Sequence, residues 1–366
     1  MTAQPAHCRV RLTPRRFLLA VSALLMTGMG CERRFSLDEL VAPPPSDVYG
    51  DTTYVLQQPV WNGFDRPTDI LVGREPFVYV ADAGNDRIAM LDLSGHLVGY
   101  SQPLRNPIAV AQDYRLDLLV CAEFDTVIAG TPVTFGAIYR IGLVSAGHDI
   151  SRAPVHRVWF DPVSAQRRYT GIAVLADNSY YVARTGPNNA SKVDPDDAVM
   201  LFDRNDVLQP RVTWPLLTPD GTGLTTISRP TAVATFPRRT TDFLFTQRGE
   251  KSLFRAQWIT HRTTGDVTQW ESYFTPARDG NVDFLRVSLF RRPEDAAVDN
   301  DGNIYIIDAE NDSLYRFDPR GNITQAFGGP AVFLHPEGVA HFDRTLYIAD
   351  TGNNRVLRFK LSTDIR

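Results

Sequence analysis

The chain has 366 residues, of which 43% are hydrophobic, 22% are charged and 10% are aromatic. This composition is that of a globular protein with a large core. The formal net charge of −4 provides no basic excess, which disfavours a nucleic-acid-binding protein. Length alone suggests about two domains, unless internal repeats account for it.

Residues 1–30 have the features of an export signal. Four arginines precede an apolar run of 13 residues at 17–29, which is shorter than the about 20 residues of a membrane-spanning helix. The run ends in Gly-Met-Gly-Cys, which resembles a bacterial lipobox, although Gly28 stands where that motif usually has Leu. The resemblance implies cleavage before Cys31 and lipidation of its sulfur. Ordinary signal cleavage beside an incidental cysteine is the alternative.

Cleavage before Cys31 would change the charge and the cysteine content of the protein. It would remove four arginines and no acid, leaving 34 basic against 42 acidic residues, a net charge of −8. Cys121 would then be the only unmodified cysteine, so no internal disulfide is expected. Its apolar surroundings, LLVCAEF, favour a buried, inert thiol over a reactive one.

Residues 31–50 show neither strand nor helix periodicity and contain three consecutive prolines. We interpret them as a tether that is semi-rigid at the prolines. Together with the signal and Cys31, this predicts an exported, lipid-anchored protein of the bacterial cell envelope, in the periplasm or at the cell surface. The remaining residues, 51–366, form one predicted repeat domain.

Three segments of that domain, 67–95, 293–321 and 336–360, match one another. Each has a short apolar strand, a turn, an alternating strand such as Val-Tyr-Val-Ala-Asp, a polar turn and another strand. Such alternation between Gly, Asn and Asp turns is typical of half-buried antiparallel strands. Weaker copies begin near 107, 170 and 230, so the repeat has six starts.

These segments resemble the NHL repeat, most closely at Asp308–Asn311 and Asp350–Val356. The resemblance implies an all-β fold, and six starts predict a six-bladed β-propeller of four-stranded antiparallel blades, with five or seven blades as the alternatives. A propeller has to close, because an open edge strand invites aggregation. The last repeat has room for only three strands. We therefore expect the strand-like residues 53–58 to supply the outer strand of the last blade.

Strand alternation predicts two unequal faces. Connections from an outer strand to the next inner strand, and from a second to a third strand, share one face. The insertions at 125–136, 185–198, 215–229 and 275–292 are assigned to this loop-rich face, and the connection at 144–156 to the opposite face. Long loops on a rigid scaffold are where binding residues concentrate, so we expect the ligand on the loop-rich face.

Basic residues precede the proline that opens several inner strands: Arg66, Arg229, Arg292 and His335. Together they predict a cationic rim for a carboxylate, phosphate or sugar-acid ligand, since Arg binds such groups bidentately. The alternative is that each pairs with a nearby acid of its own repeat.

Four acids begin the inner strands and are candidates to face the axis: Asp69, Glu294, Asp295 and Glu337. Clustered carboxylates can hold Ca²⁺ or another divalent cation. A water-filled channel with polar walls is the alternative. No other cofactor is indicated.

Some propellers of the NHL type are enzymes. The resemblance to peptide-amidating lyases would require zinc-binding histidines directly after the opening prolines. Those positions hold Thr68, Ile108, Thr231, Glu294 and Glu337, so a zinc site is disfavoured. Gluconolactonase-type propellers are also similar, and their axial divalent cation is bound by carboxylate and Asn. Asp69, Glu294 and Glu337 leave that possibility open.

No sequence motif of a hydrolase, metalloprotease or phosphate-binding loop is present. We therefore expect a non-catalytic, envelope-anchored propeller that binds a protein, peptide or glycan through its loop-rich face. The alternative is a metal-assisted hydrolase, lactonase or lyase with its site at the channel mouth.

Overall fold

The computed structural model describes residues 53–191, 193–209, 217–219, 221, 223–250, 252–264 and 267–365. The predicted export signal, the tether and Cys31 lie outside these residues. Within the described part of the chain, no helix combines the length and apolar character that a bilayer span requires.

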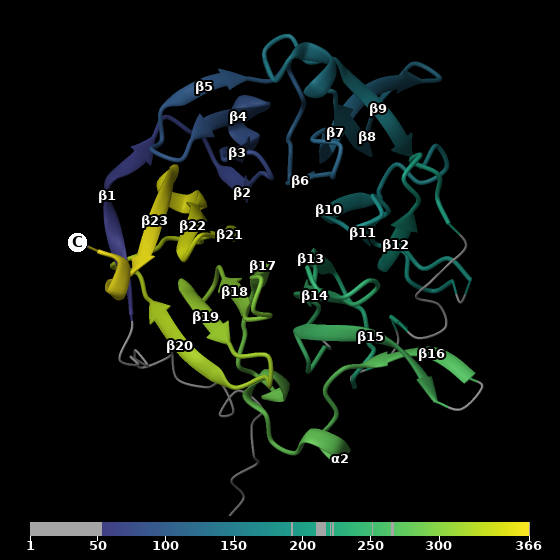
Figure 1. The fold of residues 1–366 in the computed structure, drawn as a ribbon. Helices are drawn as coiled ribbons and strands as arrows, with labels where there is room; N and C mark the ends of the chain where they lie inside the picture. The colour runs from purple at the N-terminus through teal and green to yellow at the C-terminus, as the bar shows by residue number, and fades with distance from the viewer. Residues whose placement is uncertain are drawn as a thin grey trace, which may run out of the picture. The chain divides into compact units, whose positions relative to one another are not determined.

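Six antiparallel sheets form a ring, so the fold is the six-bladed β-propeller expected from the repeats (Figure 1). Blade 1 contains β2 (Pro67–Val72), β3 (Phe77–Asp82), β4 (Arg87–Asp92) and β5 (Leu97–Tyr100). Blade 2 contains β6 (Ala109–Gln112), β7 (Leu118–Ile128), β8 (Thr131–Ile141) and β9 (Val155–Phe160). Blade 3 contains β10 (Arg168–Val174), β11 (Tyr180–Thr185) and β12 (Ala198–Phe202).

Blade 4 contains β13 (Pro230–Thr235), β14 (Phe243–Gln247), β15 (Ala256–Thr264) and β16 (Val267–Ser272). Blade 5 contains β17 (Pro293–Val298), β18 (Ile304–Asp308), β19 (Ser313–Phe317) and β20 (Ile323–Gly328). Blade 6 contains β21 (Gly338–Phe342), β22 (Thr345–Asp350), β23 (Arg355–Leu361) and β1 (Tyr54–Asn62). The six repeat starts predicted from the sequence each fall within about two residues of an inner strand.

Blade 3 differs from the other five in its outer strand. In the described residues its sheet has three strands, and Leu208 adds an isolated bridge to Phe202 of β12. In the described residues, a single β-bridge therefore stands where the other blades have a regular fourth strand.

The N-terminal strand closes the ring as predicted. β1 pairs antiparallel with β23, with Tyr54 opposite Leu361 and Leu56 opposite Phe359. The strand continues beyond the predicted segment to Asn62, and Trp61 is 5% exposed against the Tyr347 ring, 5.9 Å away between centroids. The first strand of the domain thus completes the last blade as its fourth, outermost strand.

The apolar core of the described residues lies between neighbouring blades. In β3, Val78 and Val80 pack with blade 6, whereas Tyr79 and Ala81 pack with blade 2. Both faces of one strand are thus buried, which explains why the second strands are almost continuously apolar. Cys121 belongs to the contact between blades 2 and 3, is fully buried, and has its pKa raised by burial, as an inert thiol requires.

Two of the four insertions differ from the expected loops. Residues 125–136 are part of a regular hairpin, in which β7 and β8 stay paired from Leu118–Ile141 to Ile128–Thr131. The alternating sequence continues past the end of the blade, so the two strands extend beyond it.

The segment 275–292 does not belong to the loop-rich face alone, which corrects the prediction. It contains α2 (Pro276–Asp279), which Figure 1 shows at the outer edge of the ring. Phe284 N donates to Gly321 O at 2.9 Å, and Gly321 lies in the β19–β20 turn on the opposite face. The reason is that Ser272, at the end of β16, pairs with Ile259, which itself pairs with the start of β14. The chain leaves blade 4 at the opposite face and crosses between blades 4 and 5.

Candidate functional site

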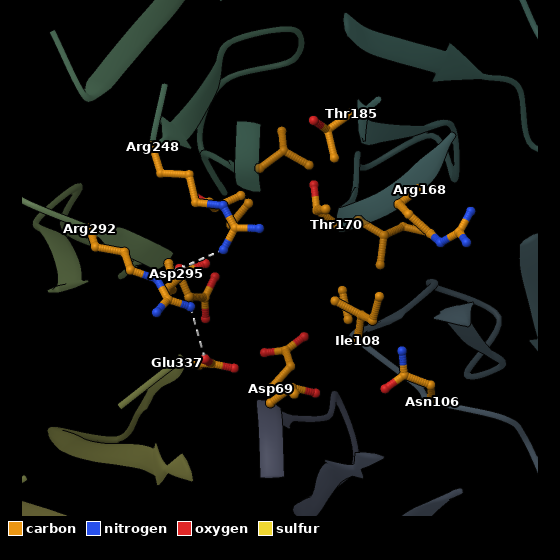
Figure 2. Close-up of a pocket in the computed structure, with 18 of the residues that line it drawn as sticks. Asp69, Asn106, Ile108, Arg168, Thr170, Thr185, Arg248, Arg292, Asp295 and Glu337 are labelled. Atoms are coloured by element: carbon orange, nitrogen blue, oxygen red, sulfur yellow. Dashed lines mark hydrogen bonds and ion pairs between the residues drawn. The ribbon is translucent and has the colours of Figure 1, made fainter. Parts of the chain in front are cut away.

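The inner strands of all six blades begin around a cavity on the propeller axis, at the loop-rich face (Figure 2). Its volume is about 390 Å³. Its charged lining residues are Arg66, Asp69, Glu123, Arg168, Arg248, Arg292, Glu294, Asp295 and Glu337. Guanidinium and carboxyl groups are thus mixed around one enclosure, rather than separated into a cationic rim and an acidic floor.

The residue before the opening proline is fixed by its backbone in several blades. Arg66, Asn106 and His335 have φ angles of 49°, 43° and 46°, a left-handed conformation that is uncommon for residues other than glycine. Their N–H groups donate at 2.7 Å to side-chain oxygens of turns that follow second strands, namely those of Asn354, Asp86 and Asp312. These bonds fix the position of the backbone at the entry to each inner strand.

Threonines after these entry points connect neighbouring inner strands. The hydroxyl of Thr68 donates to Pro107 O at 2.9 Å, Thr170 to Pro230 O at 2.9 Å, and Thr231 to Pro293 O at 2.7 Å. Each bond joins one blade to another. These threonines of the cavity wall therefore have a structural role, because they link neighbouring blades of the ring.

Two of the predicted acids, Asp69 and Asp295, accept hydrogen bonds from the backbone. Asp69 accepts from Ile70 N and from Val110 N of the next blade, at 2.6 and 2.7 Å. Asp295 accepts in the same way from Ala296 N and from a residue of blade 6. Burial raises the pKa of Asp69 to about 7 against the opposing effect of these bonds. Burial, and then the charge of Asp69, raise the pKa of Asp295 well above its usual value.

The other two acids pair with arginines. Glu294 pairs with Arg292, and also with Arg248 at 3.1 Å. Glu337 lies 3.3 Å from Arg292, and Figure 2 marks this pair with a dashed line. Burial raises the pKa of Glu337, the neighbouring Glu294 adds to this, and Arg292 opposes it. Blades 4, 5 and 6 thus share one ion-pair network at the cavity wall.

Arg66 is not part of this ion-pair network. Its guanidinium donates to the neutral Asn106 Oδ1 at 2.9 Å, and among the described residues it forms no ion pair. Arg168, across the cavity, pairs with Glu123 at 2.9 Å. Arg66 is therefore the cavity arginine with the most unused capacity to bind an anion.

The predicted rim residues do not all reach this cavity. Arg66 and Arg292 line it, whereas Arg229 lines a neighbouring hollow between blades 3 and 4. The His335 ring places Nδ1 2.9 Å from Ala309 O and is not among the cavity-lining residues. Arg292 pairs with Glu294 of its own repeat and Glu337 of the next repeat. For this residue the structure therefore shows the alternative considered above, pairing with nearby acids.

The candidate metal ligands do not form a chelating group. In the described part of the chain, no three His, Cys, Asp or Glu side chains are arranged to hold a metal ion. Asp69 and Asp295 are occupied by backbone N–H groups, and Glu294 and Glu337 by arginines. The residues present therefore do not fit the axial cation that gluconolactonase-type propellers bind through carboxylate and Asn.

Sequence reasoning missed Arg168, Arg248 and Glu123. Arg248 directly follows the second strand of blade 4, and Glu123 lies in the second strand of blade 2. Both belong to the loop-rich end of their strands, which is the signal that could have identified them. Arg168 opens β10 in a blade with no proline before its inner strand, so the X-Pro pattern passed over it.

No protein-family model matches the chain, and no curated protein matches it. Solved structures with a similar fold include an auxiliary nutrient binding protein from Bacteroides ovatus, with a TM-score of 0.56, 12% identity, and coverage of 85% of this chain and 76% of that one. A gluconolactonase from Xanthomonas campestris has a TM-score of 0.51 and 12% identity, covering 88% and 99%. Regucalcin, a calcium-binding protein from Agrobacterium tumefaciens, has a TM-score of 0.54 and 10% identity, covering 83% and 92%. These similarities show the propeller fold and do not identify a specific NHL-repeat family.

Proposed function

We propose that this protein is a non-catalytic binding propeller whose axial cavity takes a small, polyhydroxylated ligand that carries a carboxylate, such as a sugar acid. The observation that carries the proposal is the Arg66 guanidinium, which faces the cavity without a carboxylate partner among the described residues. A ligand carboxylate would form charge-assisted hydrogen bonds there, each contributing about 1.5–3 kcal/mol.

The mixed lining favours a sugar acid over a simple anion. Glu294 and Glu337 would repel a multiply charged ligand such as phosphate, but they accept hydrogen bonds from ligand hydroxyl groups. The cavity of about 390 Å³ is within the usual range for small-molecule sites. The names of the similar structures, a nutrient binding protein and a gluconolactonase, are compatible with such a ligand.

The test is calorimetric titration of the purified protein with gluconate and galacturonate, and with glucose and galactose as neutral counterparts. The acids should bind and the neutral sugars should bind about tenfold more weakly or not at all. Arg66→Gln should reduce binding of the acids about tenfold or more. Arg320→Gln, in an exposed turn on the opposite face, is the matched control and should bind as the wild type does. Equal binding of acids and neutral sugars would contradict the proposal.

The non-catalytic part of the proposal has a separate test. We expect no hydrolysis of glucono-δ-lactone, with or without added Ca²⁺, because the described residues offer no chelating group for the cation. Turnover that depends on Ca²⁺ and is lost in Asp69→Asn would instead support the metal-assisted lactonase.

Envelope anchoring is a further proposal, and it rests on the sequence alone. The lipobox-like Gly28–Cys31 supports lipidation of Cys31. In a bacterial host, wild-type protein should sediment with membranes and Cys31→Ala should be released. Unchanged membrane retention of the variant would contradict lipid anchoring and would leave the ligand proposal unaffected.

A further inference from the structure

The axial cavity adjoins two other hollows on the loop-rich face. A hollow of about 470 Å³ between blades 1 and 2 shares Arg66, Asn106 and Glu123 with it. A more open hollow of about 820 Å³ between blades 3 and 4 shares Thr185 and Arg248 with it. The three hollows thus follow one another across the face, from one blade junction through the axis to another.

Each hollow has its own arginine. Arg105 lines the hollow between blades 1 and 2, and its guanidinium, about half exposed, lies 2.9 Å from Asp125. Arg66 and Arg248 stand where the outer hollows meet the axial cavity. Arg229 lines the hollow between blades 3 and 4, is exposed, and forms no ion pair within the described residues. Positive groups therefore recur along the whole row.

The wall of the hollow between blades 3 and 4 is preorganised by ion pairs and hydrogen bonds within the protein. Its loop, between β11 and β12, is held by Arg167, whose side chain is 9% exposed and pairs with Asp161, Asp194 and Asp196 at 2.6–2.8 Å. The same loop presents Asp197, which accepts a hydrogen bond from Arg229 N at 2.9 Å. A preorganised wall lowers the cost of ordering a loop on binding.

We propose that the three hollows form one trough that binds an oligomeric acidic glycan, a chain whose repeating sugar carries a carboxylate, with at least one sugar in each hollow. This inference rests on the proposed function, because the central sugar would occupy the axial cavity. Arg105 and Arg229 bind the carboxylates of the outer sugars, and Arg66 binds that of the central sugar.

The lining favours a saccharide over an acidic peptide. The apolar side chains of the two outer hollows are only those of alanine and proline, and neither hollow has the apolar pocket with which peptide side chains are usually recognised. Charged, amide and hydroxyl side chains and glycines line the rest. The arginines match the carboxylates of a sugar chain, and the acids, amides and hydroxyls match its hydroxyl groups.

The experiment measures affinity against chain length, using galacturonate and its di-, tetra- and hexasaccharides with the full chain. The tetrasaccharide should bind about tenfold or more tightly than the monosaccharide, since each added charge-assisted contact contributes to affinity. Arg105→Gln and Arg229→Gln should each weaken the tetrasaccharide about tenfold and leave the monosaccharide unchanged. Arg66→Gln should weaken both, and Arg320→Gln neither.

The outcomes separate this inference from the proposed function. If the monosaccharide binds in an Arg66-dependent way but longer chains bind no more tightly, the trough is refuted and the axial site stands. If no galacturonate of any length binds, both are refuted. Poly-glutamate of matched charge serves as competitor, and displacement of the hexasaccharide by equal concentrations would overturn the glycan assignment in favour of an acidic peptide.

Discussion

The chain segment that leads into an inner strand is held by different residues in two groups of blades. The first group is blades 1, 5 and 6, and the second is blades 2, 3 and 4. In the first group the second strand ends in an aspartate that is fully buried: Asp82, Asp308 and Asp350. Asp350 accepts from Leu334 N at 2.7 Å, from Asn353 Nδ2 at 2.9 Å and from Arg355 Nε at 2.6 Å. Asp82 makes the equivalent bonds in blade 1.

The second group has no aspartate at the end of its second strands. In blade 4, Gln247 takes this place: its Oε1 accepts from Ser228 N at 2.7 Å, and its Nε2 donates to Thr226 O at 3.0 Å. In blade 3 the entry to the following inner strand is bonded to Asp197 of a long loop instead. The repeated aspartates are therefore part of the scaffold. The blades that lack them carry the extended hairpin, the long loop and the arginines Arg168 and Arg248.

The largest difference between the two groups should appear on removal of the buried carboxylate. Asp350→Ala leaves Arg355 and Leu334 N without their acceptor, and we expect a loss of about 3–5 kcal/mol in the free energy of unfolding. Gln247→Ala in blade 4 removes neutral bonds and should cost about 1–3 kcal/mol. Chemical denaturation measures both, and equal losses would mean that the two arrangements are equivalent.

A second difference between the two groups lies at the cavity. Blades 1 and 5 carry a carboxyl there, Asp69 and Asp295, where blades 2 and 4 carry Ala109 and Ala232. The folded-state pKa of Asp69, about 7, lies above that of the unfolded chain. The folded state therefore binds the proton more tightly, and stability should fall as pH rises from about 4 to about 7, by up to about 1.4 kcal/mol per pH unit for this group. Asp69→Asn should flatten the dependence of the unfolding midpoint on pH. Asp318→Asn, in an exposed turn, should retain the wild-type slope.

Blade 3 offers a smaller, local effect. Arg167→Gln should leave Asp196 without its guanidinium partner and cost about 1.5–3 kcal/mol. We expect faster amide hydrogen exchange in residues 186–191 and 193–197 of this variant and little change in blades 5 and 6. Faster exchange throughout the ring would indicate that the loop supports the whole fold.

The smallest effect is expected at the tip of the β7–β8 hairpin. Val127 is 67% exposed, so Val127→Ser should change the free energy of unfolding by no more than about 0.5 kcal/mol. Thermal unfolding beside the wild type measures this. A larger loss would show that the tip contacts the rest of the domain.

Most of the fold could be predicted from the sequence because its determinants are local. Alternating apolar residues and Gly, Asn and Asp turns mark strands over a few positions, and the repeat multiplies that signal. Closure of the last blade by residues 53–58 followed from counting strands, because an open blade edge is unfavourable. The same topology assigned Arg66, Arg292 and the four acids to one face, where they line the axial cavity.

What only the tertiary structure decided is how these groups are satisfied. Asp69 bonds to Val110 N, Arg292 to Glu337, and Arg66 to Asn106, in each case across two blades that are about 40 residues apart in sequence. The path of 275–292 likewise depends on the offset pairing of β16 with β15. Strand periodicity is fixed over a few residues, whereas contacts between blades exist only once the ring is closed. The sequence therefore predicted part of the set that meets at the axis, Arg66, Arg292 and the four acids, but neither the partners of these residues nor the contributions of Arg168, Arg248 and Glu123.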